Sequence, residues 1–160
     1  MIWRAFELRP EPFPTLNPKG DYLRQIWEAS VYPLAEKIGV VIKLPPVQPR
    51  TRLAHQAAHW ARSVGRFDEY NQSLFRALFE RGENIGNIDV LTSIASELGL
   101  TGDSLRGVLQ SHEFEKGVLS DQRKASRLGV TKIPAFVANN KATLTGVQSL
   151  EILEALVEKA

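Results

Sequence analysis

The side chains that carry most enzyme chemistry are sparse in this sequence. Among its 160 residues there is no cysteine, which excludes disulfides, zinc–thiolate sites and thiol catalysis by this chain alone. His55 and His59 are four residues apart, a spacing that can bind a metal ion from one helix face. They lie opposite the apolar stripe of that helix, and no neighbouring carboxylate completes an HExxH pattern. Packing is the favoured interpretation, and we predict no metal site.

The positions of several carboxylates and serines are explained by predicted helix ends. Two acidic pairs, Asp68/Glu69 and Glu80/Glu83, lie near predicted helix termini, and the first pair complements the positive end of a helix dipole. Ser111 and Ser149 stand where helices are predicted to begin, so we interpret them as caps rather than nucleophiles. The sequence has no G-x-S-x-G elbow and no glycine-rich phosphate loop. These patterns predict neither acid–base hydrolysis nor nucleotide binding.

The amino-acid composition limits the classes of protein to which this chain can belong. Hydrophobic residues make up 43% and charged residues 24%, which suits one globular domain over residues 1–160. The net charge of +2 comes from scattered side chains, so nucleic acid is not an expected partner. No apolar run approaches the roughly 20 residues of a membrane span. Met1–Arg9 lacks the pattern of a signal peptide, so a cytoplasmic location and no membrane contact are expected.

The hydrophobic periodicity predicts a long helical region between two strand-containing ends. Residues 2–8 alternate and predict a strand, and a helical stripe follows over 22–38, with a kink or break expected at Pro33. Further helices are expected to start near Thr51, Asp68, Asn87, Asp103 and Ser111. Two strands are expected over 133–138 and 141–145, with Asn139-Asn140 as their turn, followed by a helix from Ser149. The sheet part is therefore 1–20 plus 130–160, and the helical insertion is 21–129.

Three segments of the chain resemble the FrnE-type branch of the DsbA family. They are Trp3–Leu8, Gly82–Asn87, and Gly129–Val137 followed by Gly146-Val147-Gln148. The resemblance implies an α/β thioredoxin-like fold with a large helical insertion. It also implies that the chain is N-terminally truncated, because family members carry a first strand and a Cys-x-x-Cys helix ahead of the segment that matches Ile2–Leu8.

One substrate-binding loop carries over from the family. The resemblance implies a cis peptide bond before Pro134, which turns the backbone of Ile133 outward so that a peptide substrate could pair with it as an added strand. Lys132 stands where family members often have glycine, and its charge would favour a nearby thiolate. The plainer alternative is that Pro134 begins an edge strand, where a missing N–H does no harm. Arg50 and Arg52 open the insertion and could steer an anionic partner, or simply be a solvated helix start.

The expected absence of the first strand poses a physical problem. That strand would lie between residues 2–8 and the hairpin, so its loss leaves two open edges and unpaired backbone groups that cost about 1–3 kcal/mol each when buried. We therefore expect a start further upstream, a strand donated by a second copy or partner chain, or a rearranged sheet.

The resemblance leaves three functions open for this chain. The family's function is thiol–disulfide oxidoreductase or isomerase, but this chain is expected to be redox-inactive with no catalytic residue and no cofactor, since it has no cysteine. The first alternative is a non-catalytic module that binds peptides or scaffolds subunits. The second is a glutathione-dependent protein like the kappa-class transferases and related isomerases.

Overall fold

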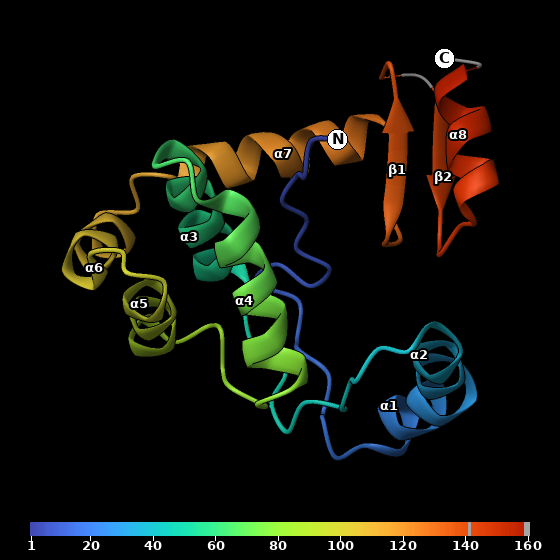
Figure 1. Ribbon diagram of the computed structural model, residues 1–160, viewed down its shortest axis with the longest axis horizontal. Coiled ribbons are helices and arrows are strands. Elements are labelled where there is room, and N and C mark those ends of the chain that lie inside the picture. Colours follow the sequence, from blue (N-terminus) through green and yellow to red (C-terminus); the bar gives the residue numbers. More distant parts are fainter. Residues whose placement is uncertain (141, 159–160) are drawn as a thin grey trace. The chain divides into compact units, whose positions relative to one another are not determined.

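The computed structural model describes residues 1–140 and 142–158, and the chain divides into two compact units. One unit is Arg9–Gly117, and the other combines Met1–Leu8 with the chain from Val118 onward. None of the helices formed by the described residues is both long and apolar enough to cross a membrane. The helices are α1 (Asp21–Ile26), a π-helical turn η1 (Trp27–Val31), α2 (Tyr32–Ile38), α3 (Arg52–Ser63), α4 (Phe67–Phe79), α5 (Ile88–Glu97), α6 (Gly102–Gln110), α7 (Glu115–Arg127) and α8 (Leu150–Glu158), and the strands are β1 (Ala135–Ala138) and β2 (Ala142–Thr145) (Figure 1).

The helix at the start of the larger unit passes through its proline without a break. Pro33 has no backbone N–H, and a proline ring crowds the carbonyl four residues earlier, here that of Ala29. The turn before it is π-helical over Trp27–Val31, which widens the backbone around that carbonyl. The expected kink is thus a widened turn. The segment ends at Gly39, whose φ is +71°, directly after the helical stripe expected over 22–38.

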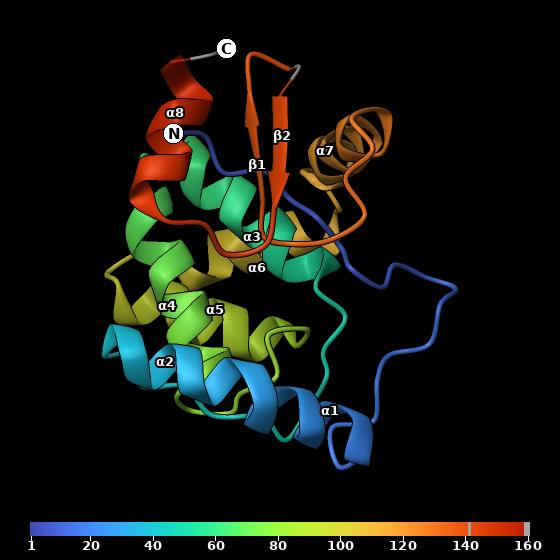
Figure 2. The same ribbon diagram turned by 90° about the vertical axis from the view of Figure 1, so that its right-hand side faces the viewer.

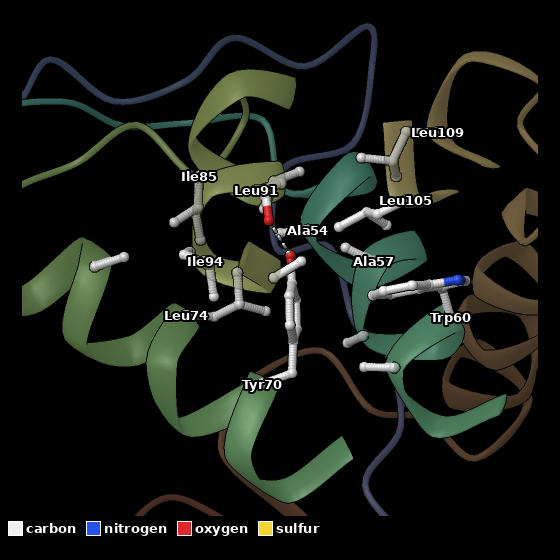
Figure 3. Packing of buried hydrophobic residues seen from close by; sticks show 14 residues of the cluster. Ala54, Ala57, Trp60, Tyr70, Leu74, Ile85, Leu91, Ile94, Leu105 and Leu109 are labelled. Carbon is white, nitrogen blue, oxygen red and sulfur yellow. Dashed lines mark hydrogen bonds between the residues drawn. The ribbon is translucent and has the colours of Figure 1, made fainter. Parts of the chain in front are cut away.

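The core of this unit lies among α3, α4, α5 and α6. Its members are the alanine-rich face of α3 and large side chains from the other three helices, among them Tyr70, Leu91 and Leu105, each fully buried (Figure 3). The Tyr70 hydroxyl donates a hydrogen bond of 2.8 Å to the Leu91 carbonyl oxygen. Burial raises the pKa of Tyr70 above its usual range, so the phenol stays neutral and keeps donating this bond.

The structure confirms some of the predicted helix caps and contradicts others. Asn87 caps α5 as predicted, accepting a hydrogen bond of 2.8 Å from the backbone N–H of Asp89. Thr51 stands at the start of α3, but its side chain makes no capping bond. The prediction for Ser111 is wrong: it ends α6, its hydroxyl donating to the Val108 carbonyl, and the next helix begins only at Glu115. A serine at a helix boundary can bond backward as well as forward.

The loop Gly82–Asn87 requires glycine at two positions. Gly82 has a φ of +70°, a conformation that side chains other than that of glycine rarely adopt. A Cβ at Gly86 would lie 2.8 Å from the Arg50 carbonyl oxygen. The glycines that mark this loop in the sequence therefore have a conformational reason at one position and a packing reason at the other.

The smaller unit contains an antiparallel hairpin with a helix beside it (Figures 1 and 2). Strands β1 and β2 are joined through Asn139 and Asn140, whose φ angles of 47° and 58° are those of the predicted tight turn. Helix α8 contacts β1, and the Ser149 hydroxyl accepts a hydrogen bond of 3.4 Å from the Ile152 N–H, as a cap at this position requires. Lys141, at which the second strand is predicted to begin, is outside the described residues.

The predicted strand over Ile2–Leu8 is wrong, because this segment forms no strand in the structure. Its backbone is held instead by two side chains of α7. Asp121 accepts a hydrogen bond of 3.0 Å from the Ala5 N–H, and Gln122 both accepts from the Glu7 N–H at 2.8 Å and donates to its carbonyl oxygen at 3.2 Å. These bonds satisfy the groups that a neighbouring strand would otherwise pair.

Candidate peptide-binding site

The loop that leads into β1 presents an exposed backbone next to a fixed turn. The chain leaves α7 through Gly129 and the buried Val130, and Ile133 is 49% exposed. The Ile133–Pro134 peptide bond is cis. The Pro134 carbonyl oxygen accepts a hydrogen bond of 2.8 Å from the Gly146 N–H, which ties the loop to the end of β2.

The strand register decides which backbone groups face outward. Ala135 is opposite Thr145 and Val137 is opposite Thr143. Because the Pro134–Gly146 pair is hydrogen-bonded, and bonded and non-bonded pairs alternate in an antiparallel ladder, Ala135 and Val137 belong to non-bonded pairs. Their N–H and C=O groups therefore point away from β2.

These outward groups form an open strand edge. Within residues 1–140 and 142–158, the sheet consists of β1 and β2 alone, so the other side of β1 has no strand beside it. No hydrogen bond to the backbone of Ile133, Ala135 or Val137 is found from the described part of the chain. Such an edge can take an extended peptide, whose own N–H and C=O groups would complete the ladder.

The two arginines singled out in the sequence both make internal contacts. Arg50 donates to the carbonyl oxygens of Arg9 and Phe13 at 2.9 and 2.7 Å, which fastens the loop ahead of α1 to the start of α3. Arg52 pairs with Glu115 at 3.0 Å. Each guanidinium therefore has a structural role, and the steering of an anionic partner stays a prediction.

The two histidines of α3 are both half-buried and both make interactions. His59 lies against Gly117, where an added Cβ would come within 3.1 Å of its Nδ1 atom. Among the described residues, no three histidine, aspartate or glutamate side chains gather as metal ligands would. The position of His59 is explained by its close packing against Gly117.

Sequence reasoning missed the polar residues of α7 that hold the N-terminal segment. Asp121 is 5% exposed and also accepts a hydrogen bond of 3.1 Å from the Arg4 guanidinium. The available signal was its position in the helix, three residues after the buried Val118 and so on the same face. A carboxylate on a buried stripe requires a partner, and here the partners are Arg4 and the Ala5 N–H.

Comparison with known proteins places this arrangement in a family. Residues 1–158 match the model of the DSBA-like thioredoxin domain family. The chain belongs to this family. Its fold is accordingly the DsbA-like thioredoxin fold with a helical insertion, which is rich in helix and has a small antiparallel sheet.

Two similar proteins agree with this result, one by sequence and the other by fold. This DsbA-like chain is 36% identical over 160 residues to the uncharacterised protein YwbO of Bacillus subtilis, covering 95% of this chain and 78% of that protein. It also resembles the crystal structure of a probable DsbA oxidoreductase from Streptomyces coelicolor, with a TM-score of 0.79 and 21% identity. That match covers 98% of this chain and 73% of the other, and at this identity it shows the fold alone.

Proposed function

We propose that this DsbA-like chain holds extended peptide segments along the open edge of β1, at Ile133, Ala135 and Val137, in the service of thiol–disulfide chemistry that its own 160 residues do not perform. The observation that carries the proposal is the set of outward-facing backbone groups that begins next to Pro134. Backbone pairing recognises an extended chain of almost any sequence, which suits a family that acts on disulfides in many proteins. The thioredoxin-domain family supports the same substrate class.

Backbone pairing predicts a distinctive dependence on the peptide's N–H groups. We expect a five-residue peptide of alternating valine and threonine, labelled with a fluorophore, to bind the chain. N-methylation of the alternate residues that face β1 should weaken its binding at least about fivefold, because each lost hydrogen bond is worth about 0.5–1.5 kcal/mol. N-methylation of the intervening residues should leave binding unchanged. Fluorescence anisotropy measures both, and equal effects of the two methylation patterns would refute pairing along the edge.

The chain offers a matched pair of variants for the same test. Val137 and Thr143 are directly opposite in a non-bonded pair, so the N–H of each faces away from the other strand. Val137→Pro removes a donor from the proposed edge, and Thr143→Pro removes one from the outer edge of β2; neither touches the ladder between the strands. Peptide binding should weaken in Val137→Pro alone. Equal losses in both variants would contradict the proposal.

The second part of the proposal is redox inactivity. Disulfide exchange requires an attacking thiolate, and the sequence contains no cysteine. The purified chain should therefore reduce insulin no faster than dithiothreitol alone. Turnover above that background would overturn this part while leaving the peptide-binding test intact. The chain should also be titrated with glutathione, because saturable binding would favour a glutathione-dependent function instead.

The exposed apolar side chains of α8 favour subunit scaffolding as a second candidate function. Among the described residues of α8 none is buried, and Leu150 and Val157 are each 71% exposed. A second copy or a partner subunit that donates a strand to β1 would cover such side chains. A native mass of twice 17.9 kDa that returns to 17.9 kDa in Val137→Pro would favour this candidate. A monomer at all concentrations would reject the second copy.

A further inference from the structure

A small concave site lies at the end of the hairpin farthest from the Pro134 loop. Its cavity of about 310 Å³ is lined by Lys124 and Arg127 from the end of α7, by Leu128 directly after this helix, and by Asn140 from the turn after β1. Lys124 and Arg127 share one face of α7 because they are three positions apart. Among the described residues, the lining contains two cationic groups and one amide but no carboxylate.

Lys124 and Arg127 have no carboxylate partner among residues 1–140 and 142–158. In the part of the chain that the structure describes, neither Lys124 nor Arg127 forms an ion pair, whereas other arginines, among them Arg4, Arg52 and Arg106, pair with Asp or Glu at 3.1 Å or less. Two like charges three residues apart on a helix repel each other. An anion placed between them would remove that repulsion, and a concave wall strengthens the attraction by concentrating the field.

Lys124 and Arg127 are not needed to cap the carbonyl groups at the end of α7. Basic residues in the last turn of a helix often bond its final carbonyl oxygens. Here the carbonyls of Lys124, Ala125 and Ser126 accept hydrogen bonds of 3.0 to 3.1 Å from the N–H groups of Leu128, Gly129 and Val130. The side chains of Lys124 and Arg127 are therefore available for a ligand.

We propose that this pocket binds the side-chain carboxylate of an acidic residue in a partner peptide or protein. A guanidinium binds a carboxylate through two parallel hydrogen bonds, and the lysine adds a second positive charge. The Asn140 amide can donate a further bond, and Leu128 offers apolar surface to the methylene groups of a glutamate side chain. The site is separate from the open edge of β1 and does not depend on its occupation.

Nuclear magnetic resonance of the isotope-labelled full chain tests this directly. The probe is N-acetyl-glutamate α-amide, whose only charge is the side-chain carboxylate, and its neutral control is N-acetyl-glutamine α-amide. We expect saturable shifts of the Asn140 side-chain amide and the Leu128 methyl groups with the glutamate compound and none with the glutamine compound. High salt should weaken binding, because exposed charges are screened.

Two variants that each lose one positive charge distinguish binding at this pocket from a general attraction of the anionic probe to a positively charged protein. Arg127→Gln and Lys116→Gln each remove one positive charge from α7, but Lys116 is eight residues from Lys124, about 12 Å along the helix. Arg127 is exposed and has no ion pair, so its substitution should leave the fold intact, which circular dichroism checks. Glutamate binding should weaken at least about fivefold in Arg127→Gln, the loss of a single charge-assisted hydrogen bond, and less than twofold in Lys116→Gln. Equal weakening in both, or shifts with inorganic phosphate but none with the glutamate compound, would overturn the proposal.

Discussion

Replacing Leu105 with alanine is expected to lower the free energy of unfolding by about 2–5 kcal/mol, a large share of the stability of a domain of this size. Leu105 is 0% exposed and belongs to the core cluster shared by α3, α4, α5 and α6. Removing three carbons there leaves a cavity that the surrounding helices can only partly close. Urea unfolding followed by circular dichroism measures the change.

Leu150→Ala is the matched control for this result. It deletes the same atoms at a side chain that is 71% exposed, so its effect should stay within about 0.5 kcal/mol. If the two variants lose similar stability, the core does not lie among α3 to α6 as described.

Replacing Asp121 with alanine is expected to cost about 2–3 kcal/mol and to free the N-terminal segment. The carboxylate is buried and accepts from both the Ala5 N–H and the Arg4 guanidinium, and its removal leaves a buried donor without a partner. The amide proton of Ala5 should then exchange much faster with solvent. Hydrogen exchange measured by nuclear magnetic resonance, together with urea unfolding, tests both effects.

Two comparison variants sharpen the Asp121 prediction. Asp121→Asn keeps an acceptor for the Ala5 N–H while losing the charge, so it should fall between the wild type and Asp121→Ala. Glu36→Ala removes an exposed carboxylate from α2 and should change stability by less than about 0.5 kcal/mol. Unchanged exchange at Ala5 in Asp121→Ala would mean that the segment is held by other contacts.

The features that sequence reasoning predicted well are those that depend on neighbouring residues. The asparagine turn between β1 and β2, the Asn87 cap and the glycine that ends the helix at Gly39 each follow from the local conformation that one residue type allows. Helix periodicity likewise placed Ala57 and Trp60 on the buried face of α3, but Val64, expected on the same face, is 46% exposed. Such signals need no knowledge of what lies elsewhere in the chain.

The features that it missed depend on distant partners. Residues 2–8 have the alternation of a strand, but a strand also needs a neighbour, and here side chains more than a hundred residues away, Asp121 and Gln122, bond the backbone instead. Arg50, which the sequence suggested for the steering of an anionic partner, is a second example. Its carbonyl partners, Arg9 and Phe13, are 41 and 37 residues away and give no signal in the local sequence.

The candidate site was predicted in part. The loop Lys132-Ile133-Pro134 could be named because it resembles a family motif, whereas the outward direction of the Ala135 and Val137 backbone follows only from the strand register. The pocket at Asn140 was missed, since its lining comes from two elements whose contact the local sequence does not indicate.

Amide hydrogen exchange with and without the valine–threonine peptide tests the central claim most directly. If the peptide pairs with the open edge of β1, exchange should slow at Ile133, Ala135 and Val137, whose N–H groups would become donors in a new ladder. Thr143 and Thr145, whose N–H groups face the outer edge of β2, should exchange as before. Protection at the two threonines, or none at Ile133, Ala135 and Val137 when the peptide is bound, would contradict the proposed peptide-binding site.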